Sequence, residues 1–313
     1  MSDVGTIAIV GTGALGGYVG AHLAKDNNSV RFLVRRDYDA LKQHGFHVRL
    51  VDAEDFTVPA PKIFQSPSEI GHVDLVIVAL KTTQNESLAQ LLPPLVGEHT
   101  QLLTIQNGLG NVERLSALFP QNKVLGGLCQ IGVDREAPGR LVSYVPGGGS
   151  IQVGAGAHAT MDDVDAIATM LKDSGLKTRS LESLGEALWR KLMWNVPFNG
   201  LTVATGGHTT DHIVGTPALR ELSTALMNEL VTAANALGFP IESSFTEKQI
   251  GFTDKLGAYP PSSLVDWRAK RPIEVEAIWG EPLRQGASVG VEMPHLQTLH
   301  AILEGLNASL LKS

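Results

Sequence analysis

A glycine-rich turn near the N-terminus has the spacing of a dinucleotide-binding loop. The segment Gly11-Thr12-Gly13-Ala14-Leu15-Gly16 has the form GxGxxG, follows an apolar run typical of a strand, and opens a helical stretch. The first glycine permits a tight turn, the second lets the backbone approach a pyrophosphate, and the third lets the helix pack against the strand. Unpaired N–H groups of the first helical turn then attract the pyrophosphate. We therefore predict a dinucleotide site with contacts from Gly11, Gly13, Ala14, Leu15 and Gly16; a glycine-rich turn without a ligand is the alternative.

The residues after the second predicted strand indicate which dinucleotide is bound. An NAD enzyme usually has Asp or Glu there, which binds the 2′-hydroxyl of the ribose. In this chain the strand ends at Val34 and is followed by Arg35, Arg36 and Asp37. A guanidinium group matches the oxygens of a 2′-phosphate, which favours NADP(H) as the cofactor. In the alternative, both arginines are solvated, Asp37 binds the ribose and the cofactor is NAD.

Two further polar residues follow predicted strands of the N-terminal half. Lys81 comes after Asp74–Leu80, and Asn107 comes after Gln101–Gln106. In an open α/β sheet, ligands bind outside the carboxyl ends of the strands, so both side chains are candidates for ligand contact. Lys81 is equally compatible with a surface position, and Asn107-Gly108 with an ordinary turn. The spacing alone does not decide between these interpretations.

The C-terminal half contains a polar stripe in an otherwise apolar segment. Lys191, Asn195 and Asn199 are spaced by four residues, which puts them on one face of a helix. Such a stripe is either the solvent face of an amphipathic helix or the polar lining of a cleft. The solvent face is the ordinary interpretation, but asparagine is a weak helix former, so two of them beside the lysine make the lining of a cleft more plausible. Pro197 lacks a backbone N–H and predicts a kink or the end of the helix near that point.

A second polar cluster in this half begins at Ser262, and its members also have structural explanations. Ser263 and Asp266 match a capping box at a helix start. Glu274 follows Pro272, where the dipole of a new helix would favour acidic residues. The residue chemistry alone therefore leaves a functional role for this cluster open.

One pair of histidines has the spacing of metal ligands. His208 and His212 lie four residues apart, but no HExxH motif and no nearby cysteine accompanies them. We interpret the segment as a turn followed by a helix start, and we expect no metal site.

Short apolar runs alternate with helical stretches through the first half, which favours a parallel sheet covered by helices on both faces. Strands are expected at Thr6–Val10, Ser29–Val34, Asp74–Leu80, Gln101–Ile105, Val124–Gln130 and Leu176–Leu181, and a helix at Asp162–Ser174. Two alternating runs around Pro146-Gly147-Gly148-Gly149 predict a hairpin at the sheet edge. From about Leu184 helical periodicity dominates, as in Leu219–Leu237 and in a last helix that begins near Pro294. We therefore predict a Rossmann-type doubly wound α/β domain over residues 1–182 and an all-helical domain over residues 183–313.

The composition narrows the class of protein. The chain has 313 residues, which is enough for two domains of roughly 150 residues each. A formal charge of −7, without a block of Lys or Arg, argues against binding to nucleic acid or to an anionic membrane. The single cysteine, Cys129, excludes an internal disulfide and is expected to be a buried small hydrophobic residue. The run Ile7–Ala24 is rich in glycine and has no features of an export signal, so a cytoplasmic protein is expected.

Taken together, these residues resemble the ketopantoate reductase (2-dehydropantoate 2-reductase) family along nearly the whole chain. The more specific shared motifs are Leu80-Lys81-Thr82, Gln106-Asn107-Gly108-Leu109-Gly110, Lys191-Leu192-x-x-Asn195 and Arg271-x-x-Glu274. The resemblance implies that Lys191 is catalytic and that Glu274, counted with it as catalytic, binds the substrate hydroxyl. It also implies a substrate site lined by Asn107, Asn195, Asn199 and Ser262, and contacts to NADPH from Arg35, Lys81 and Asn107.

The resemblance predicts NADPH-dependent reduction of 2-dehydropantoate (ketopantoate) to pantoate, a step of pantothenate and coenzyme A biosynthesis. The segment Val275–Trp279 departs from the usual Ile-Asp-Tyr-Ile-Asn, which leaves another 2-keto acid as an alternative substrate. A non-catalytic, NADP-binding redox sensor is the alternative from a different class. The stripe that contains Lys191 argues against a sensor, because a sensor needs no proton donor. The resemblance also suggests a homodimer formed through the helical domain.

Overall fold

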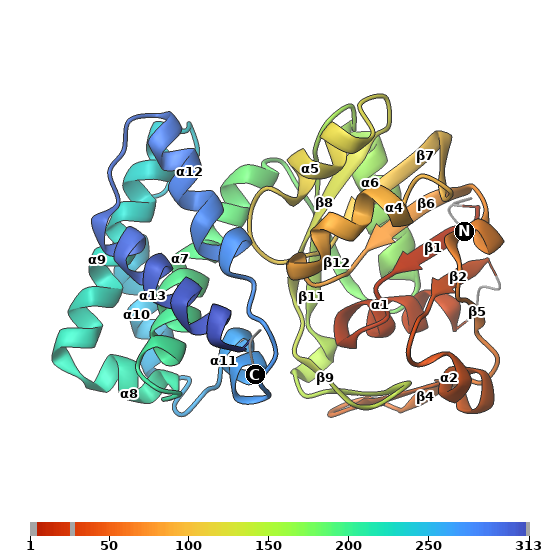
Figure 1. Cartoon of the computed structure of the whole chain (residues 1–313), viewed down its shortest axis with the longest axis horizontal. Helices are drawn as coiled ribbons and strands as arrows, with labels where there is room; N and C mark the ends of the chain where they lie inside the picture. Colours follow the sequence, from red (N-terminus) through yellow and green to blue (C-terminus); the bar gives the residue numbers. More distant parts are fainter. Residues whose placement is uncertain (1–4, 26–28, 311–313) are drawn as a thin grey trace. The chain divides into compact units, whose positions relative to one another are not determined.

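The computed structural model describes residues 5–25 and 29–310, and these form two compact units (Figure 1). The first unit comprises the described residues up to Gln106 together with Asn111–Leu184. The second unit begins at Gly185 and also includes the loop Asn107–Gly110. The chain thus sends a short loop, with Asn107 at its start, from the first unit into the second.

The first unit is built on an eight-stranded sheet in the order β12-β11-β8-β7-β6-β1-β2-β5. Its strands are β1 (Ile7–Val10), β2 (Val30–Leu33), β5 (Lys62–Phe64), β6 (Val73–Val78), β7 (Val96–Thr104), β8 (Val124–Gln130), β11 (Ser150–Ala155) and β12 (Lys177–Leu181). Neighbouring strands run parallel except for β8 and β11. The strands expected from the sequence are confirmed, although β7 starts at Val96 rather than at Gln101.

Helices cover both faces of this sheet, as a doubly wound fold requires. They are α1 (Ala14–Ala24), α2 (Tyr38–His44), α3 (Pro67–Ile70), η1 (Thr82–Ser87), α4 (Leu88–Leu91), α5 (Asn111–Leu118) and α6 (Met161–Asp173). Ile7 and Ile9 of β1 pack in one apolar cluster with residues of α1 and α6. The alternate residues, Ala8 and Val10, pack in another cluster with residues of α3, α4 and α5. Both faces of β1 are therefore buried, which explains why its sequence is continuously apolar.

The predicted hairpin around Pro146–Gly149 is wrong, because its two strands belong to different sheets. A second sheet has the order β4-β3-β10-β9. It consists of β3 (Phe46–Leu50), β4 (Phe56–Val58), β9 (Val133–Ala137) and β10 (Arg140–Ser143). Strand β10 pairs with β3 and β9, whereas β11 pairs with β8 and β12. The intervening glycines have positive φ angles and carry the chain from one sheet to the other.

The described residues of the second unit contain helices and no strand, which confirms the prediction for this half. The helices are α7 (Leu184–Ala204), α8 (Thr210–Gly215), α9 (Pro217–Ala236), α10 (Ser244–Asp254), α11 (Ser262–Arg268), the π-helical turn η3 (Glu276–Gly280), α12 (Glu281–Ser288) and α13 (Pro294–Leu310). The predicted apolar stripes are buried, as Leu226 and Leu230 of α9 and Leu299 of α13 illustrate. Within residues 5–25 and 29–310, no helix has the length and apolar character that crossing a bilayer requires.

Helix α7 does not end at Pro197 but continues to Ala204. The residues on both sides of the proline, Val196 and Phe198, are fully buried in the apolar core of the second unit. Because burial of such side chains is worth about 1.5–3 kcal/mol each, the core compensates for the hydrogen bond that proline cannot make.

A histidine is buried in the first unit with one ring nitrogen unpartnered. His22 of α1 is 7% exposed and makes T-shaped contacts with the rings of Tyr18 and Phe56. Its Nδ1 lies 3.1 Å from the carbonyl oxygen of Ser174, an arrangement that requires a proton on Nδ1. Its Nε2 has no partner among the described residues. Burial lowers the pKa of His22 below its ordinary value, because a charge on this ring would be poorly solvated.

Because the pKa of His22 is lower in the folded chain, this residue should make the free energy of unfolding fall in mild acid. The unfolded chain gains a proton on this residue near pH 6.5 while the folded chain resists it, so stability is lost as the pH falls below about 6.5, down to the folded-state pKa. His22→Gln does not titrate, so its loss of stability between about pH 7.5 and 5.5 should be smaller than that of the wild type in urea unfolding. His99→Gln, at an exposed position, is the control and should follow the wild type. Equal losses in His22→Gln and wild type would contradict the assignment.

Candidate active site

The glycine turn of the first unit has the geometry that its sequence predicts. Gly11 has a φ of +103°, and a Cβ at this position would lie 2.5 Å from the backbone nitrogen of Leu80. A Cβ on Gly16 would overlap the carbonyl oxygen of Gly11, so that α1 packs closely against the end of β1. No atom lies within 4 Å of the corresponding point on Gly13, and no side chain caps α1. The turn therefore leaves the first N–H groups of α1 available to an anionic group.

Three cationic side chains follow the strands on either side of this turn. Arg35 and Arg36 follow β2 and are exposed, and Lys81, also exposed, precedes η1. Nη2 of Arg35 donates a hydrogen bond of 2.6 Å to Oε1 of Gln84 in η1. Asp37, the candidate ribose ligand of an NAD enzyme, forms an ion pair with Arg135 instead. The residues after β2 thus present the positive charge of two arginines, while the carboxylate of Asp37 is already paired with Arg135.

A network of amide side chains, which the residue patterns did not single out, links the ends of β6 and β7. Nε2 of Gln106 donates to the carbonyl oxygen of Leu80 at 2.8 Å and to Oδ1 of Asn85 at 2.7 Å. Nδ2 of Asn85 in turn donates to Oδ1 of Asn111 at 3.0 Å. Gln106 and Asn111 are the residues that flank the loop Asn107–Gly110, so the network fixes both ends of that loop. Gln106 is buried, and its place in the motif that includes Asn107 was the signal available in the sequence.

The structure joins Asn107 and Lys191 in the second unit. Nζ of Lys191, on α7, donates a hydrogen bond of 2.7 Å to Oδ1 of Asn107. The loop that carries Asn107 turns through Gly108, whose φ is +83°. The N–H of Leu109 in the same loop donates to the carbonyl oxygen of Ala277 at 2.8 Å. Asn107 is therefore more than an ordinary turn residue, because its side chain orients the ammonium group of Lys191.

The polar stripe of α7 faces the interior and not the solvent. Lys191 is half-buried, Asn195 is 9% exposed and Asn199 is 1% exposed. Glu274 is also buried, at 5% exposure, and its carbonyl oxygen accepts the N–H of Ile278 at the start of the following helical segment. Buried polar groups need polar partners, so this stripe is not the solvent face of an amphipathic helix.

The side chain of Asn199 contacts Ser262 and Ser263 at the start of α11 and serves there as a helix cap. Oδ1 of Asn199 accepts the N–H of Ser263 at 2.9 Å and the hydroxyl of Ser262 at 3.3 Å. The predicted capping box of Ser263 with Asp266 is absent, and Asp266 forms an ion pair with Arg271. The N-cap of α11 is a proline, which has no side-chain acceptor, so a residue from another helix supplies the acceptor.

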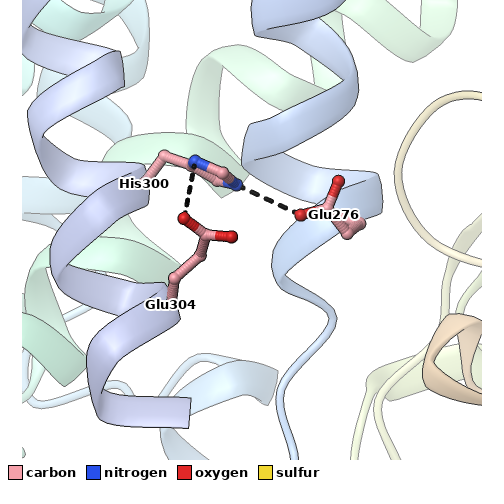
Figure 2. A group of neighbouring side chains, drawn as sticks. All are labelled: Glu276, His300 and Glu304. Atoms are coloured by element: carbon pink, nitrogen blue, oxygen red, sulfur yellow. Dashed lines mark hydrogen bonds and ion pairs between the residues drawn. The ribbon is translucent and has the colours of Figure 1, made fainter. Parts of the chain in front are cut away.

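Another group, Glu276, His300 and Glu304, has ligand atoms within 4.8 Å of one another (Figure 2). Oε1 of Glu276 lies 3.4 Å from Nε2 of His300, whereas Oε2 of Glu304 lies 3.6 Å from Nδ1. The two carboxylates therefore approach different ring nitrogens, and one ion bound to the ring would face only one of them. The guanidinium of Arg284, 2.7 Å from Glu276, holds the pKa of that carboxyl below its usual range. The group is best described as a chain of polar contacts that ties η3 to α12 and α13.

The two histidines with metal-like spacing are stacked on each other. The ring centroids of His208 and His212 are 3.9 Å apart. Thr209 is the N-cap of α8, which begins at Thr210. The interpretation of this segment as a turn and helix start is confirmed.

Replacing Asn199 should destabilise the second unit. Asn199→Leu removes the acceptor for the buried N–H of Ser263, which should cost about 1–3 kcal/mol. For a unit of this size, each kcal/mol should lower Tm by about 2–4 °C in a thermal melt. Ser262→Ala is the control. It removes only an exposed hydroxyl that donates to the same Oδ1 of Asn199, so its loss of stability should be much smaller. A Tm unchanged by Asn199→Leu would exclude the capping role.

Comparisons with known proteins identify the family. The family models described as "Ketopantoate reductase PanE/ApbA" and "Ketopantoate reductase PanE/ApbA C terminal" match residues 7–158 and 184–307. A 2-dehydropantoate 2-reductase from Nostoc sp. is 37% identical over 307 residues, which cover 96% of this chain and 94% of that relative.

Solved structures agree with this result. The 2-dehydropantoate 2-reductase from Geobacter metallireducens GS-15 has a TM-score of 0.90 at 38% identity, and the match covers 96% of this chain and 99% of that one. A D-mandelate dehydrogenase with NADH and anilino(oxo)acetate shares the fold, with a TM-score of 0.86 at 22% identity and coverage of 97% and 99%. The match of both family models, over most of the length of both units, means that the chain belongs to the ketopantoate reductase family.

Proposed function

We propose that this chain reduces 2-dehydropantoate (ketopantoate) to pantoate with NADPH as the hydride donor. The observation that carries the proposal is the ammonium group of Lys191, oriented by Oδ1 of Asn107 at 2.7 Å. The interior of the same unit contains the buried polar side chains of Asn195 and Glu274. The names of the relatives from Nostoc and Geobacter, both 2-dehydropantoate 2-reductases, support the same reaction.

The reaction adds a hydride to the carbonyl carbon of a 2-keto acid and a proton to the carbonyl oxygen. A bound nicotinamide dinucleotide supplies the hydride. Lys191 donates a hydrogen bond to the carbonyl oxygen, stabilises the negative charge that develops there, and transfers the proton that completes the hydroxyl group. Asn107 accepts one N–H of the ammonium group and so limits the directions in which the others point.

Glu274, Asn195, Asn199 and Ser262 contribute to substrate binding in this proposal. Glu274 accepts a hydrogen bond from the substrate hydroxyl. Its carboxylate is buried, so a substrate hydroxyl bound there would be held away from bulk water. Asn195 lines the site directly, while Asn199 contributes through Ser262, whose hydroxyl it holds.

The first unit supplies residues that fit the dinucleotide. Gly11, Gly13 and the first turn of α1 would bind the pyrophosphate, because the backbone at Gly13 is open and α1 has no side-chain cap. Arg35 would bind the 2′-phosphate of NADPH, and Lys81 would add a second positive charge at the same edge of the sheet. The ion pair of Asp37 with Arg135 supports NADPH over NADH, since the carboxylate that would bind the ribose of NAD is already engaged.

Removing the ammonium group should abolish most of the activity. Purified protein supplied with NADPH and a panel of 2-keto acids should turn over ketopantoate fastest. Lys191→Ala should lower kcat on the order of 10²–10³-fold, with NADPH binding near that of the wild type in a fluorescence titration. Lys248→Ala, at an exposed position of α10, is the control and should retain wild-type activity.

Three outcomes of that experiment would overturn parts of the proposal. An active Lys191→Ala variant would remove the catalytic assignment. Faster turnover of another 2-keto acid would replace the substrate. A protein that binds NADPH but reduces none of the panel would be a sensor rather than an enzyme.

The choice between NADPH and NADH should depend on Arg35. Arg35→Ala removes a charged partner of the 2′-phosphate, which is worth about 1.5–3 kcal/mol, so NADPH should bind roughly 10- to 100-fold more weakly while NADH binding changes little. Arg49→Ala, at an exposed position of β3, is the matched control. A parallel loss for both dinucleotides, measured by titration, would contradict a role at the 2′-phosphate.

A further inference from the structure

The π-helical turn η3 leaves one of its carbonyl groups without a helical donor. The N–H of Glu281 donates to the carbonyl oxygen of Glu276, five residues back, as π-helical geometry requires. In the same register the carbonyl of Ala277 would be paired with residue 282, but that residue is Pro282, which has no N–H. The carbonyl oxygen of Ala277 instead accepts the N–H of Leu109 at 2.8 Å. The register of η3 together with Pro282 thus creates the point at which the Asn107–Gly110 loop is bound.

The same turn is joined to α7 by a tryptophan. Trp279 is fully buried, and its indole N–H donates to the carbonyl oxygen of Val196 at 2.9 Å. Val196 lies between Asn195 and Pro197 on α7. A Cβ at Gly200, one helical turn further on, would lie 2.9 Å from the indole nitrogen, so the absence of a side chain there makes room for the ring. One turn of helix therefore contacts both the loop that carries Asn107 and the helix that carries Lys191.

On its outer side the turn is fixed by charged groups. Glu276, its first residue, is ion-paired with Arg284 of α12 and contacts His300 of α13 (Figure 2). These groups are largely exposed, except for the ring of His300, so their contribution to stability is small. The buried contacts of Ala277 and Trp279 are the ones that determine where the turn sits against α7 and the loop.

We propose that Trp279 is a positioning residue of the reaction, and that η3 sets the geometry of the Lys191–Asn107 pair. This inference rests on the proposed function of Lys191. The turn follows Glu274 closely in the chain, binds the Asn107 loop through Ala277 and binds α7 through Trp279. A displacement of the turn would shift two groups together. One is the carboxylate of Glu274, which binds the substrate hydroxyl in the proposed function, and the other is the amide of Asn107, which orients the ammonium group of Lys191.

The test is a double-mutant cycle with Lys191. Trp279→Phe keeps a buried aromatic ring but loses the N–H that binds Val196, and it should lower kcat roughly 10- to 100-fold with little change in the KM for NADPH. In the Lys191→Ala background the same substitution should lower kcat much less, because the group that Trp279 positions is already absent. Trp194→Phe is the matched control: it also removes one indole hydrogen bond in the second unit, of 3.0 Å to Thr253, and should leave kcat near wild type.

A merely structural role gives a different result. If Trp279→Phe lowers kcat by the same factor with and without Lys191, or does not lower it at all, the positioning role is overturned while the proposed function stands. If Lys191→Ala is itself fully active, the catalytic assignment of Lys191 fails first, and the positioning role has nothing to act on.

Pro282→Ala tests the inference without altering the tryptophan. The new N–H competes for the carbonyl of Ala277, so the amide of Leu109 should exchange with solvent faster than in the wild type, and kcat should fall. Unchanged exchange at Leu109 in this variant would contradict the role assigned to the register of η3.

Discussion

The chemistry proposed for the second unit depends on the hydrogen bond between Lys191 and Asn107. A lysine on a helix surrounded by Leu192, Met193 and other core residues needs a polar partner, because an unpaired ammonium group is costly away from water. One such partner, Asn107, lies on a loop far earlier in the sequence. Asn107 can reach Lys191 only because the loop Asn107–Gly110 packs with the helices of the second unit.

In the second unit, two backbone groups that lack a local hydrogen-bond partner are paired with groups from distant segments. Pro261 at the N-cap of α11 offers no acceptor, and Asn199 of α7 provides one. Pro282 offers no donor to η3, and Leu109 of the loop provides one. Each deficit is local and readable in the sequence, but the group that meets it comes from a different element. Because unsatisfied buried groups cost about 1–3 kcal/mol, such pairings give α7, α11, η3 and the loop defined relative positions.

Much of the fold could be predicted because it follows from local rules. The strand Ile7–Val10, the glycine turn and helix α1 appear as expected, and so do the apolar stripes of α9 and α13. The hairpin at Pro146–Gly149 could not be predicted correctly, because alternation identifies a strand but does not identify its partner. The capping box of Ser263 failed for a related reason, since a remote acceptor replaced the local one.

The sequence by itself determined that the first half is α/β and the second half helical, and it determined the dinucleotide-binding turn and the identity of the polar residues. Each of these depends on periodicity, backbone freedom or side-chain type within a few residues. The tertiary structure decided that the stripe of α7 is buried, that Asn107 meets Lys191, and that Asp37 is paired with Arg135. These are contacts between residues far apart in the chain. Their energies depend on distance and burial, which exist only after the segments have packed together.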